Sequence, residues 1–167
     1  MELLRERAET GRIYIMNIDH CNTHSSFKDK VYMSNLCQEI TLPTKPVQHI
    51  DDEEGEIALC ILSAVNLGLL TDIDELEELC DLSVRALDEI IDYQEYPVEA
   101  AKISTLARRS LGIGFIGLAH YLAKNQVNYE SKAAAKLVDK VSEAFQFYLL
   151  KASNNLAKEK SKCLWFE

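Results

Sequence analysis

The chain has 167 residues, a length that suits one domain or a large piece of one. Hydrophobic residues make up 47% and charged residues 27%, as in a globular protein with its own core. No apolar run approaches the ~18 residues of a membrane-spanning helix, and the charged N-terminus lacks the apolar segment of a secretory signal. We therefore expect neither a membrane protein nor a secreted precursor, and we expect the chain in the cytoplasm.

The net charge of −9 is concentrated in one segment. Residues 51–95 contain fifteen acidic residues and one base, Arg85, whereas residues 1–50 are neutral and residues 96–167 are net basic. Binding to a phosphate backbone needs a basic face, so nucleic acid is not an expected partner. We interpret the acidic block as a solvated loop and helix face.

Five cysteines occur at irregular spacing and without a C-x-x-C pair: Cys21, Cys37, Cys60, Cys80 and Cys163. This pattern excludes a zinc ribbon and a thioredoxin-type motif. In a reducing cytosol thiols stay free unless they carry out chemistry. A structural disulfide framework is therefore not expected, and catalytic or redox thiols remain open.

Predicted strands alternate with predicted helices, which indicates an α/β architecture with a helix-rich C-terminal half. In chain order the pattern predicts a helix at 2–9, a short buried strand at 12–19, a polar turn at 20–30, an extended segment at 31–42, an acidic turn at 51–55, a buried strand at 57–66, helices at 71–96 and 97–110, a glycine-bearing strand or turn at 111–117, a helix to 124 and a long amphipathic helix at 131–160.

We thus predict helical segments over about 72–160, and we expect residues 1–167 to form a single fragment without an internal domain boundary. The chain stops directly after the aromatic pair Trp165 and Phe166, which we expect to point into a core. We therefore expect an internal piece of a larger protein.

Two motifs have both a functional and a structural interpretation. His20, Cys21 and His24 can bind metal, but no further ligand is evident, so a hydrogen-bonded loop is favoured and a small metal-binding module is the alternative. Residues 112–117 contain G-x-G-x-x-G. A helical segment follows instead of a second strand ending in an acid, so we favour glycines that allow close packing over a dinucleotide site.

The third motif is the segment around Cys37. In an extended chain side chains alternate, so Asn35, Cys37 and Glu39 are expected to project from the same side. An amide, a thiol and a carboxylate that face one way form a candidate site, and the polar face of an edge strand is the alternative. Cys60 lies within the apolar run 57–66, where burial is the common outcome.

Several segments of the sequence resemble those of a known protein family. The segments Asn35-Leu-Cys-Gln-Glu39, Gly55-Glu-Ile-Ala-Leu-Cys60 and Leu62-Ser-Ala-Val-Asn-Leu-Gly68 are similar to the catalytic large subunit of class I ribonucleotide reductase, and the similarity runs in order through the whole chain. It implies a partial ten-stranded α/β barrel with a central finger loop at about 31–46.

The resemblance also implies roles. Cys37 would become a thiyl radical that removes the ribose 3′ hydrogen, Glu39 would act as general base at the 3′ hydroxyl, and Asn35 would hydrogen-bond the substrate. Leu36 and Gln38 would complete the substrate-binding segment. Cys60 matches one thiol of a redox pair, whereas Cys21, Cys80 and Cys163 match no role and are assigned to packing.

The same resemblance implies partners. The segment itself would bind no metal or cofactor. A metal-containing small subunit would supply the radical, and an external dithiol of the thioredoxin or glutaredoxin type would supply electrons. The further partners would be the remaining large-subunit segments and a ribonucleoside diphosphate substrate. We expect the isolated chain to be inactive, and an inactive remnant of the same fold is the alternative.

Overall fold

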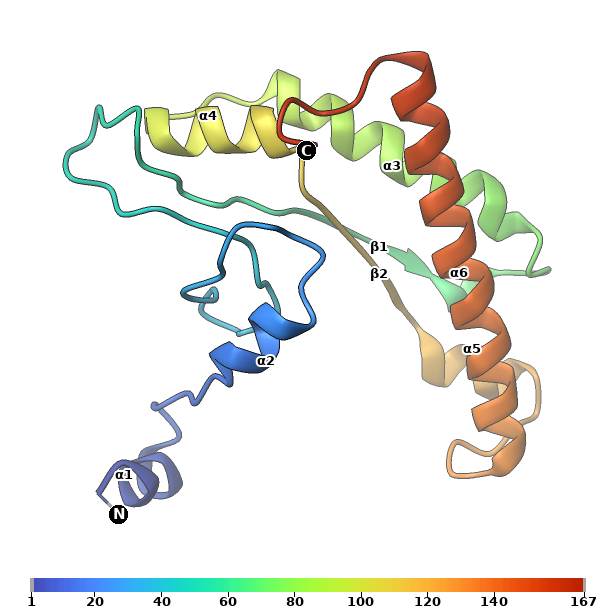
Figure 1. The fold of residues 1–167 in the computed structure, drawn as a ribbon. Coiled ribbons are helices and arrows are strands. Elements are labelled where there is room, and N and C mark those ends of the chain that lie inside the picture. Colours follow the sequence, from blue (N-terminus) through green and yellow to red (C-terminus); the bar gives the residue numbers. More distant parts are fainter. Residues whose placement is uncertain (1, 167) are drawn as a thin grey trace. The chain divides into compact units, whose positions relative to one another are not determined.

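The structure, a computed structural model, describes residues 2–166. It divides into two compact units (Figure 1). The first runs through Ala58 and includes Val98–Ile103, and the second consists of Leu59–Pro97 and the chain from Ser104 onward. The helix α4, Glu99–Arg108, contributes residues to both units.

The first unit contains little regular structure. Helix α1, Glu2–Thr10, ends where the Gly11 N–H donates to the Arg7 carbonyl oxygen at 2.9 Å, and Gly11 adopts a left-handed φ of 65°. This confirms the predicted first helix. After helix α2, Ile18–Thr23, the chain runs irregularly up to one antiparallel bridge between Lys45 and Glu56.

The predicted buried strand at 12–19 is wrong. Residues 12–17 are irregular, and α2 begins at Ile18. Within α2 the side chains of Asn22 and Thr23 donate to carbonyl oxygens one helical turn back, those of Ile18 and Asp19. Among the described residues no strand pairs with residues 12–17, and Tyr14 is 55% exposed. The β-branched and aromatic residues of this segment favour a strand only where another strand is available for pairing.

The second unit is built on two parallel strands. Strand β1, Ile61–Asn66, pairs with β2, Leu111–Ile116, in a register that runs from Ile61 opposite Leu111 to Asn66 opposite Ile116. The predicted strand at 57–66 therefore starts later than expected. It is also not buried on both faces, because Val65 is 7% exposed whereas Leu62 is 60% exposed. Among the described residues, the helical residues of the main core pack on the face that carries Val65.

The main core of this unit lies between the sheet and two long helices, α3 at Glu75–Tyr93 and α6 at Lys132–Glu159, which pack side by side (Figure 1). Phe115 of β2 meets Phe145 of α6 edge to face with ring centroids 5.6 Å apart. The core residues are Val65, Leu67, Leu70, Leu76, Cys80, Tyr121, Val141 and Phe145.

The predicted helix boundaries are close to those observed. The long helix predicted at 131–160 is observed as α6, and the Ser131 hydroxyl caps it by accepting from the Ala134 N–H. Helix α3 begins after Asp74 instead of at residue 71, and the Glu75 carboxylate accepts the backbone N–H groups of Thr71 and Asp72. The remaining short elements are the 3₁₀ turn η1 at Leu67–Leu69 and helix α5 at Leu118–Lys124.

Most acidic residues of the block are exposed, as the sequence interpretation expects, and several of them also form ion pairs. On α3, Asp88 and Asp92 bind Arg109, and Lys160 also bonds to Asp88. Lys151 pairs with Glu77. The net-basic C-terminal part of the chain thus folds back onto acidic helix α3, and charge pairing between the two accompanies the apolar packing.

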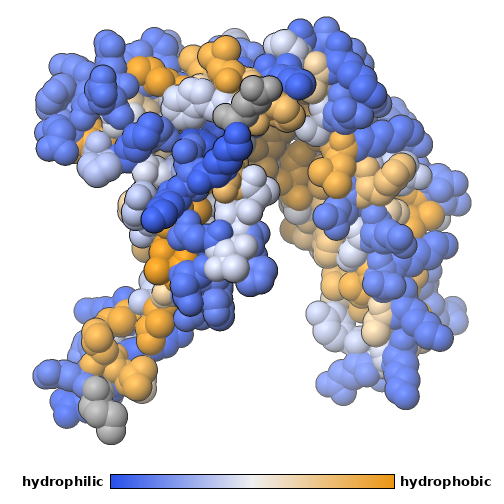
Figure 2. All heavy atoms as spheres, in the orientation of Figure 1, coloured by the Kyte–Doolittle hydropathy of each residue, from blue (hydrophilic) through white to orange (hydrophobic). Residues whose placement is uncertain are grey.

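Apolar and polar side chains are interspersed over the visible surface (Figure 2). Leu3 and Leu4 of α1 are 67% and 58% exposed, and Phe147 and Leu150 of α6 are 60% and 64% exposed. Among residues 2–166 no helix is both long and apolar enough to cross a membrane.

Candidate functional site

The predicted site residues lie on a turn, not on an extended strand. The Gln38 N–H donates to the Asn35 carbonyl oxygen at 3.1 Å, and Gln38 has a φ of 60°. The expectation that Asn35, Cys37 and Glu39 share one side through strand alternation is therefore wrong. Asparagine and serine side chains bond readily to nearby backbone, and here they close a local turn.

Asn35 holds this turn together through both ends of its side-chain amide. Its Nδ2 donates to Glu39 Oε1 at 2.5 Å, and its Oδ1 accepts the Ile40 N–H at 3.1 Å. The Ser34 hydroxyl donates to the Ile40 carbonyl oxygen at 2.6 Å. The turn, and not the pleat of a strand, therefore brings Asn35 and Glu39 into contact.

Cys37 lies between these two residues in the sequence and is exposed as a free thiol. Leu36 beside it is 81% exposed, and Gln38 is half-buried. An exposed thiol with a bonded amide and carboxylate on either side is accessible to a small polar molecule. This turn, residues 35–39, can present a hydrogen-bond donor, a thiol and a proton acceptor to the same ligand.

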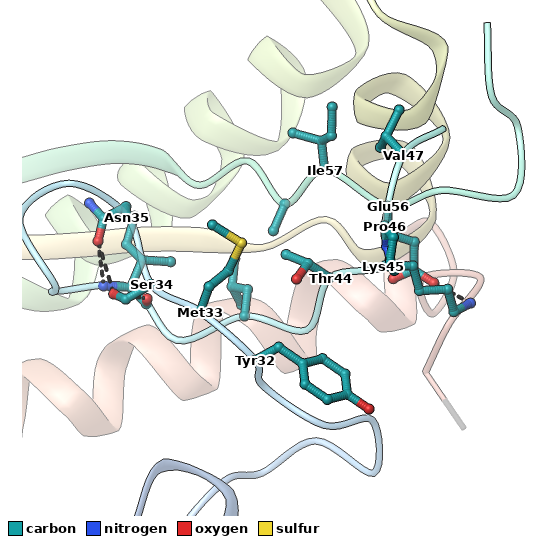
Figure 3. Close-up of a pocket in the computed structure, with 13 residues that line it drawn as sticks. Tyr32, Met33, Ser34, Asn35, Thr44, Lys45, Pro46, Val47, Glu56 and Ile57 are labelled. Carbon is teal, nitrogen blue, oxygen red and sulfur yellow. Dashed lines mark hydrogen bonds and ion pairs between the residues drawn. The ribbon is translucent and has the colours of Figure 1, made fainter. Parts of the chain in front are cut away.

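A cavity of about 800 Å³ lies next to the turn within the first unit. Figure 3 shows Asn35 at one end of the residues that line it and the Lys45–Glu56 ion pair at the other. Its lining is mostly apolar and includes Tyr32, Met33, Ile40, Leu42, Val47 and Ile57. Neither Cys37 nor Glu39 lines the cavity, so only Asn35 connects it with the predicted site.

The Lys45–Glu56 pair was not anticipated from the sequence. Glu56 is 5% exposed, its carboxylate bonds to Lys45 Nζ, and the two residues also form the antiparallel bridge. Asp52, likewise buried, accepts N–H groups from Gln48, Glu54 and Gly55, and these bonds lower the pKa of its carboxyl below the usual value. The acidic turn at 51–55 is thus a hydrogen-bonded structural element.

Cys60 belongs to the second unit and directly precedes β1. It is half-buried, and it lies on the face of the sheet that carries exposed Leu62. The sequence predicted that Cys60 would lie in a strand buried on both faces, and this is not observed. Its thiol lies over Gly112 of β2, where the absence of a side chain leaves room for it.

The other cysteines behave as packing residues to different degrees. Cys80 is fully buried in the core, and burial raises the pKa of its thiol to about 11. Cys21 and Cys163 are half-buried. Within residues 2–166 no disulfide joins any two of the five cysteines.

The two alternative motifs gain no support. His20 and His24 lie on or next to α2 with ring centroids 6.4 Å apart, and His24 Nδ1 is 3.1 Å from the His20 carbonyl oxygen. Within residues 2–166 no three His, Cys, Asp or Glu side chains are grouped for a metal ion. Gly112 and Gly114 lie inside β2, and Gly117 precedes α5 with a φ of 75°, so this motif is a strand and a helix start.

Parallel strands connected through helices, with helices covering one face, define an α/β protein. Along residues 1–167 the sequence matches the family model described as "Ribonucleotide reductase, barrel domain". The chain belongs to this family, as the sequence resemblance predicted.

The chain is also similar to named relatives over nearly its whole length. It is 64% identical to the ribonucleoside-diphosphate reductase subunit alpha of Haemophilus influenzae and 61% identical to that of Buchnera aphidicola subsp. Schizaphis graminum, each over 98% of this chain. It is 58% identical to the ribonucleoside-diphosphate reductase 1 subunit alpha of Escherichia coli. The chain spans 22% of the length of each of these relatives.

One solved structure is similar as well. The fold matches an Actinobacillus ureae class Id ribonucleotide reductase alpha subunit with a TM-score of 0.75 and 27% sequence identity. The match covers 98% of this chain and 32% of that one. Sequence and structure therefore agree on the family.

Proposed function

We propose that this chain supplies part of the catalytic core of a ribonucleoside-diphosphate reductase, an enzyme that converts ribonucleotides to deoxyribonucleotides. The observation that carries the proposal is the turn at 35–39, in which exposed Cys37 is flanked by Asn35 and Glu39 in direct hydrogen-bond contact. Membership of the family and the names of the relatives support the same reaction.

In the proposed reaction a thiyl radical at Cys37 removes the hydrogen atom from C3′ of the ribose, re-forming the thiol. Glu39 accepts the proton of the 3′ hydroxyl, and Asn35 hydrogen-bonds the substrate. Groups that act on one sugar carbon must lie within a few ångströms of each other, and the Asn35–Glu39 bond holds two of the three groups together. Leu36 and Gln38 complete the substrate-binding segment.

Cys60 is proposed as one thiol of the redox pair. Reduction at C2′ releases the 2′ hydroxyl as water and takes two electrons and two protons from two thiols, which become a disulfide. The second thiol would come from a part of the subunit outside this chain. An external dithiol of the thioredoxin or glutaredoxin type would then reduce the disulfide.

The proposal includes the larger assembly. The parallel β1–β2 pair would form part of a ten-stranded α/β barrel, and residues 31–46 would form its central finger loop. The remaining large-subunit segments would complete the barrel, and a metal-containing small subunit would generate the radical. The substrate would be a ribonucleoside diphosphate, and the site of action the cytoplasm.

The test is a segment exchange. In the Haemophilus influenzae alpha subunit, the matching segment is replaced by this chain, to which it is 64% identical, and the hybrid subunit is assayed with its small subunit for deoxynucleotide formation. We expect turnover by the hybrid and none by the Cys37→Ser hybrid or by the 167-residue chain alone. A folded hybrid that binds the small subunit but forms no product would overturn the proposal and favour an inactive remnant.

A further inference from the structure

We propose that Gly112 is a positioning residue for Cys60: its lack of a side chain leaves the space in which the Cys60 thiol lies. The proposal rests on the redox role proposed for Cys60 and adds a residue to it. Gly112 pairs with Leu62 in the parallel register, and Cys60 lies two residues before Leu62 on the same side of β1.

The space over Gly112 is filled by side chains from the neighbouring strand. A Cβ atom at this position would lie 2.4 Å from Leu62 Cδ2 and 2.8 Å from Cys60 Sγ. Carbon and sulfur atoms in ordinary contact are about 3.5 Å apart or more, so a methyl group would force the thiol to move by roughly 0.7 Å. The third nearest atom is the Ile61 carbonyl oxygen at 3.8 Å, which is an ordinary contact.

No backbone requirement explains a glycine at this position. Gly112 does not have a left-handed φ, in contrast to Gly11 and Gly117. Glycine inside a strand costs conformational entropy and often marks a place where another group approaches closely. Here the two close groups are the ends of side chains, and the backbone oxygen of Ile61 lies at an ordinary contact distance, so alanine would displace the thiol while leaving the strand intact.

Gly114 provides a matched control on the same strand. It lies two residues further along β2 on the same face, opposite Ala64, and a Cβ atom there would meet no atom within 4 Å. Gly114→Ala therefore introduces the same methyl group and the same change in chain entropy without touching Cys60. Gly114→Ala should be at least as stable as the native chain, whereas displaced side chains offset part of that gain in Gly112→Ala, and thermal unfolding of both variants checks that each is folded.

The first readout is the reactivity of Cys60 in the 167-residue chain. Iodoacetamide labelling of each cysteine is followed by peptide mass spectrometry for the native chain, Gly112→Ala and Gly114→Ala. The Cys60 face of the sheet is open at Leu62, so we expect the displaced thiol in Gly112→Ala to react severalfold faster, and Gly114→Ala to match the native chain. Equal rates in all three proteins would overturn the proposal, whatever the hybrid subunit does.

The second readout is the fate of substrate in the hybrid subunit. A displaced Cys60 should leave the step at C3′ intact and slow the reduction at C2′, so released base should rise relative to deoxynucleotide. Because small misplacements of reacting groups are costly, we expect deoxynucleotide formation to fall about tenfold to a hundredfold in Gly112→Ala. A fold defect would lower both products in proportion.

The two readouts separate the proposals. Normal product from a Cys60→Ser hybrid would overturn the redox role of Cys60, while the labelling rates would still decide whether Gly112 positions the thiol. Faster labelling combined with an unchanged ratio of base to deoxynucleotide in Gly112→Ala, in a hybrid that requires Cys60, would overturn the functional part of the proposal.

Discussion

Asn35 donates a hydrogen bond of 2.5 Å to Glu39 across the turn that exposes Cys37. The same Asn35 side chain accepts the Ile40 N–H, so one amide fixes both the carboxylate and the backbone of the turn. Of the three residues proposed to act on the sugar, Asn35 thus positions Glu39 by direct contact and Cys37 through the backbone of the turn.

The proposed roles of these residues predict a ranking of variants in the hybrid subunit. Cys37→Ser should abolish turnover, because a serine O–H bond is too strong to replace thiol radical chemistry. Glu39→Gln should be severe, because the base is lost while the radical can still form. Asn35→Ala should keep a reduced rate, since one hydrogen bond is worth about 1–3 kcal/mol, or roughly one to two orders of magnitude. Deoxynucleotide formation at saturating substrate measures all three.

The control for this ranking is unchanged binding of the small subunit by each variant, together with Cys21→Ser as a thiol substitution outside the turn. That variant should keep the full rate. Equal and mild losses at positions 35, 37 and 39 would contradict the catalytic assignment and leave the turn as a polar surface element.

Cys60→Ser should behave differently from Cys37→Ser. The 3′ hydrogen remains accessible to the Cys37 radical, but one of the two reducing thiols is missing. We expect substrate breakdown with release of free base in place of deoxynucleotide, measured with labelled substrate by chromatography. Normal product at a normal rate would show that Cys60 only packs against the sheet.

The Arg109 network should make the second unit sensitive to acid. Arg109 Nε donates to Asp88 Oδ1 at 2.7 Å, and its Nη1 donates to Asp92 Oδ1 at 2.8 Å. Burial raises the pKa of Asp88, but the hydrogen bonds from Arg109 and Lys160 outweigh it, so the net pKa lies below the usual value. The pKa of Asp92 is also lowered, chiefly by Arg109.

Because these pKa values are lower in the folded state, the stabilisation is complete above the ordinary aspartate value near 3.8 and is lost as the pH falls through the folded values. Arg109→Met should lower the free energy of unfolding by about 1.5–3 kcal/mol at pH 7 and flatten its decline in acid. Urea unfolding at a series of pH values measures this. Lys151→Met, which breaks only an exposed pair with Glu77, should leave the free energy of unfolding at pH 7 and its decline in acid nearly unchanged. A similar loss in the two variants would contradict the prediction.

Cysteine labelling should follow burial. Cys80 is fully buried with a pKa raised to about 11, so it carries almost no thiolate at pH 8, whereas Cys37 is exposed. With iodoacetamide at pH 8 we expect early modification of Cys37 and modification of Cys80 only in denaturant. Labelling of Cys80 in the native chain at the rate of Cys37 would show that the core around α3 and α6 is open.

The long helices of the second unit were largely predictable. The apolar period of residues 131–160 and the capping residue Ser131 define α6 almost to the residue, because a long periodic segment carries its own signal. The strand predicted at residues 12–19 was wrong because a strand, unlike a long helix, depends on a partner elsewhere in the chain. Their β-branched and aromatic composition favours a strand only where another strand is available, and within the described residues none pairs with them.

At the candidate site the residues could be named from the sequence, but their geometry could not. Strand alternation predicted a shared side for Asn35 and Glu39, and the observed contact arises instead from a turn with Gln38 at positive φ. No sequence signal marks Gln38, because glutamine rarely adopts that conformation. A signal did exist for Gly112, since a glycine within an apolar strand suggests a close approach.

The parallel pairing of β1 with β2 has a consequence for how the chain folds. Each paired residue in β1 is separated by fifty positions from its partner in β2, as in Ile61 opposite Leu111. Such a pair forms only after a long loop, which includes α3, has closed, whereas the contacts within α6 are local. We therefore expect α6 to acquire helical structure early and the strands to join late, with the Cys60 thiol reaching its place over Gly112 among the last events of folding.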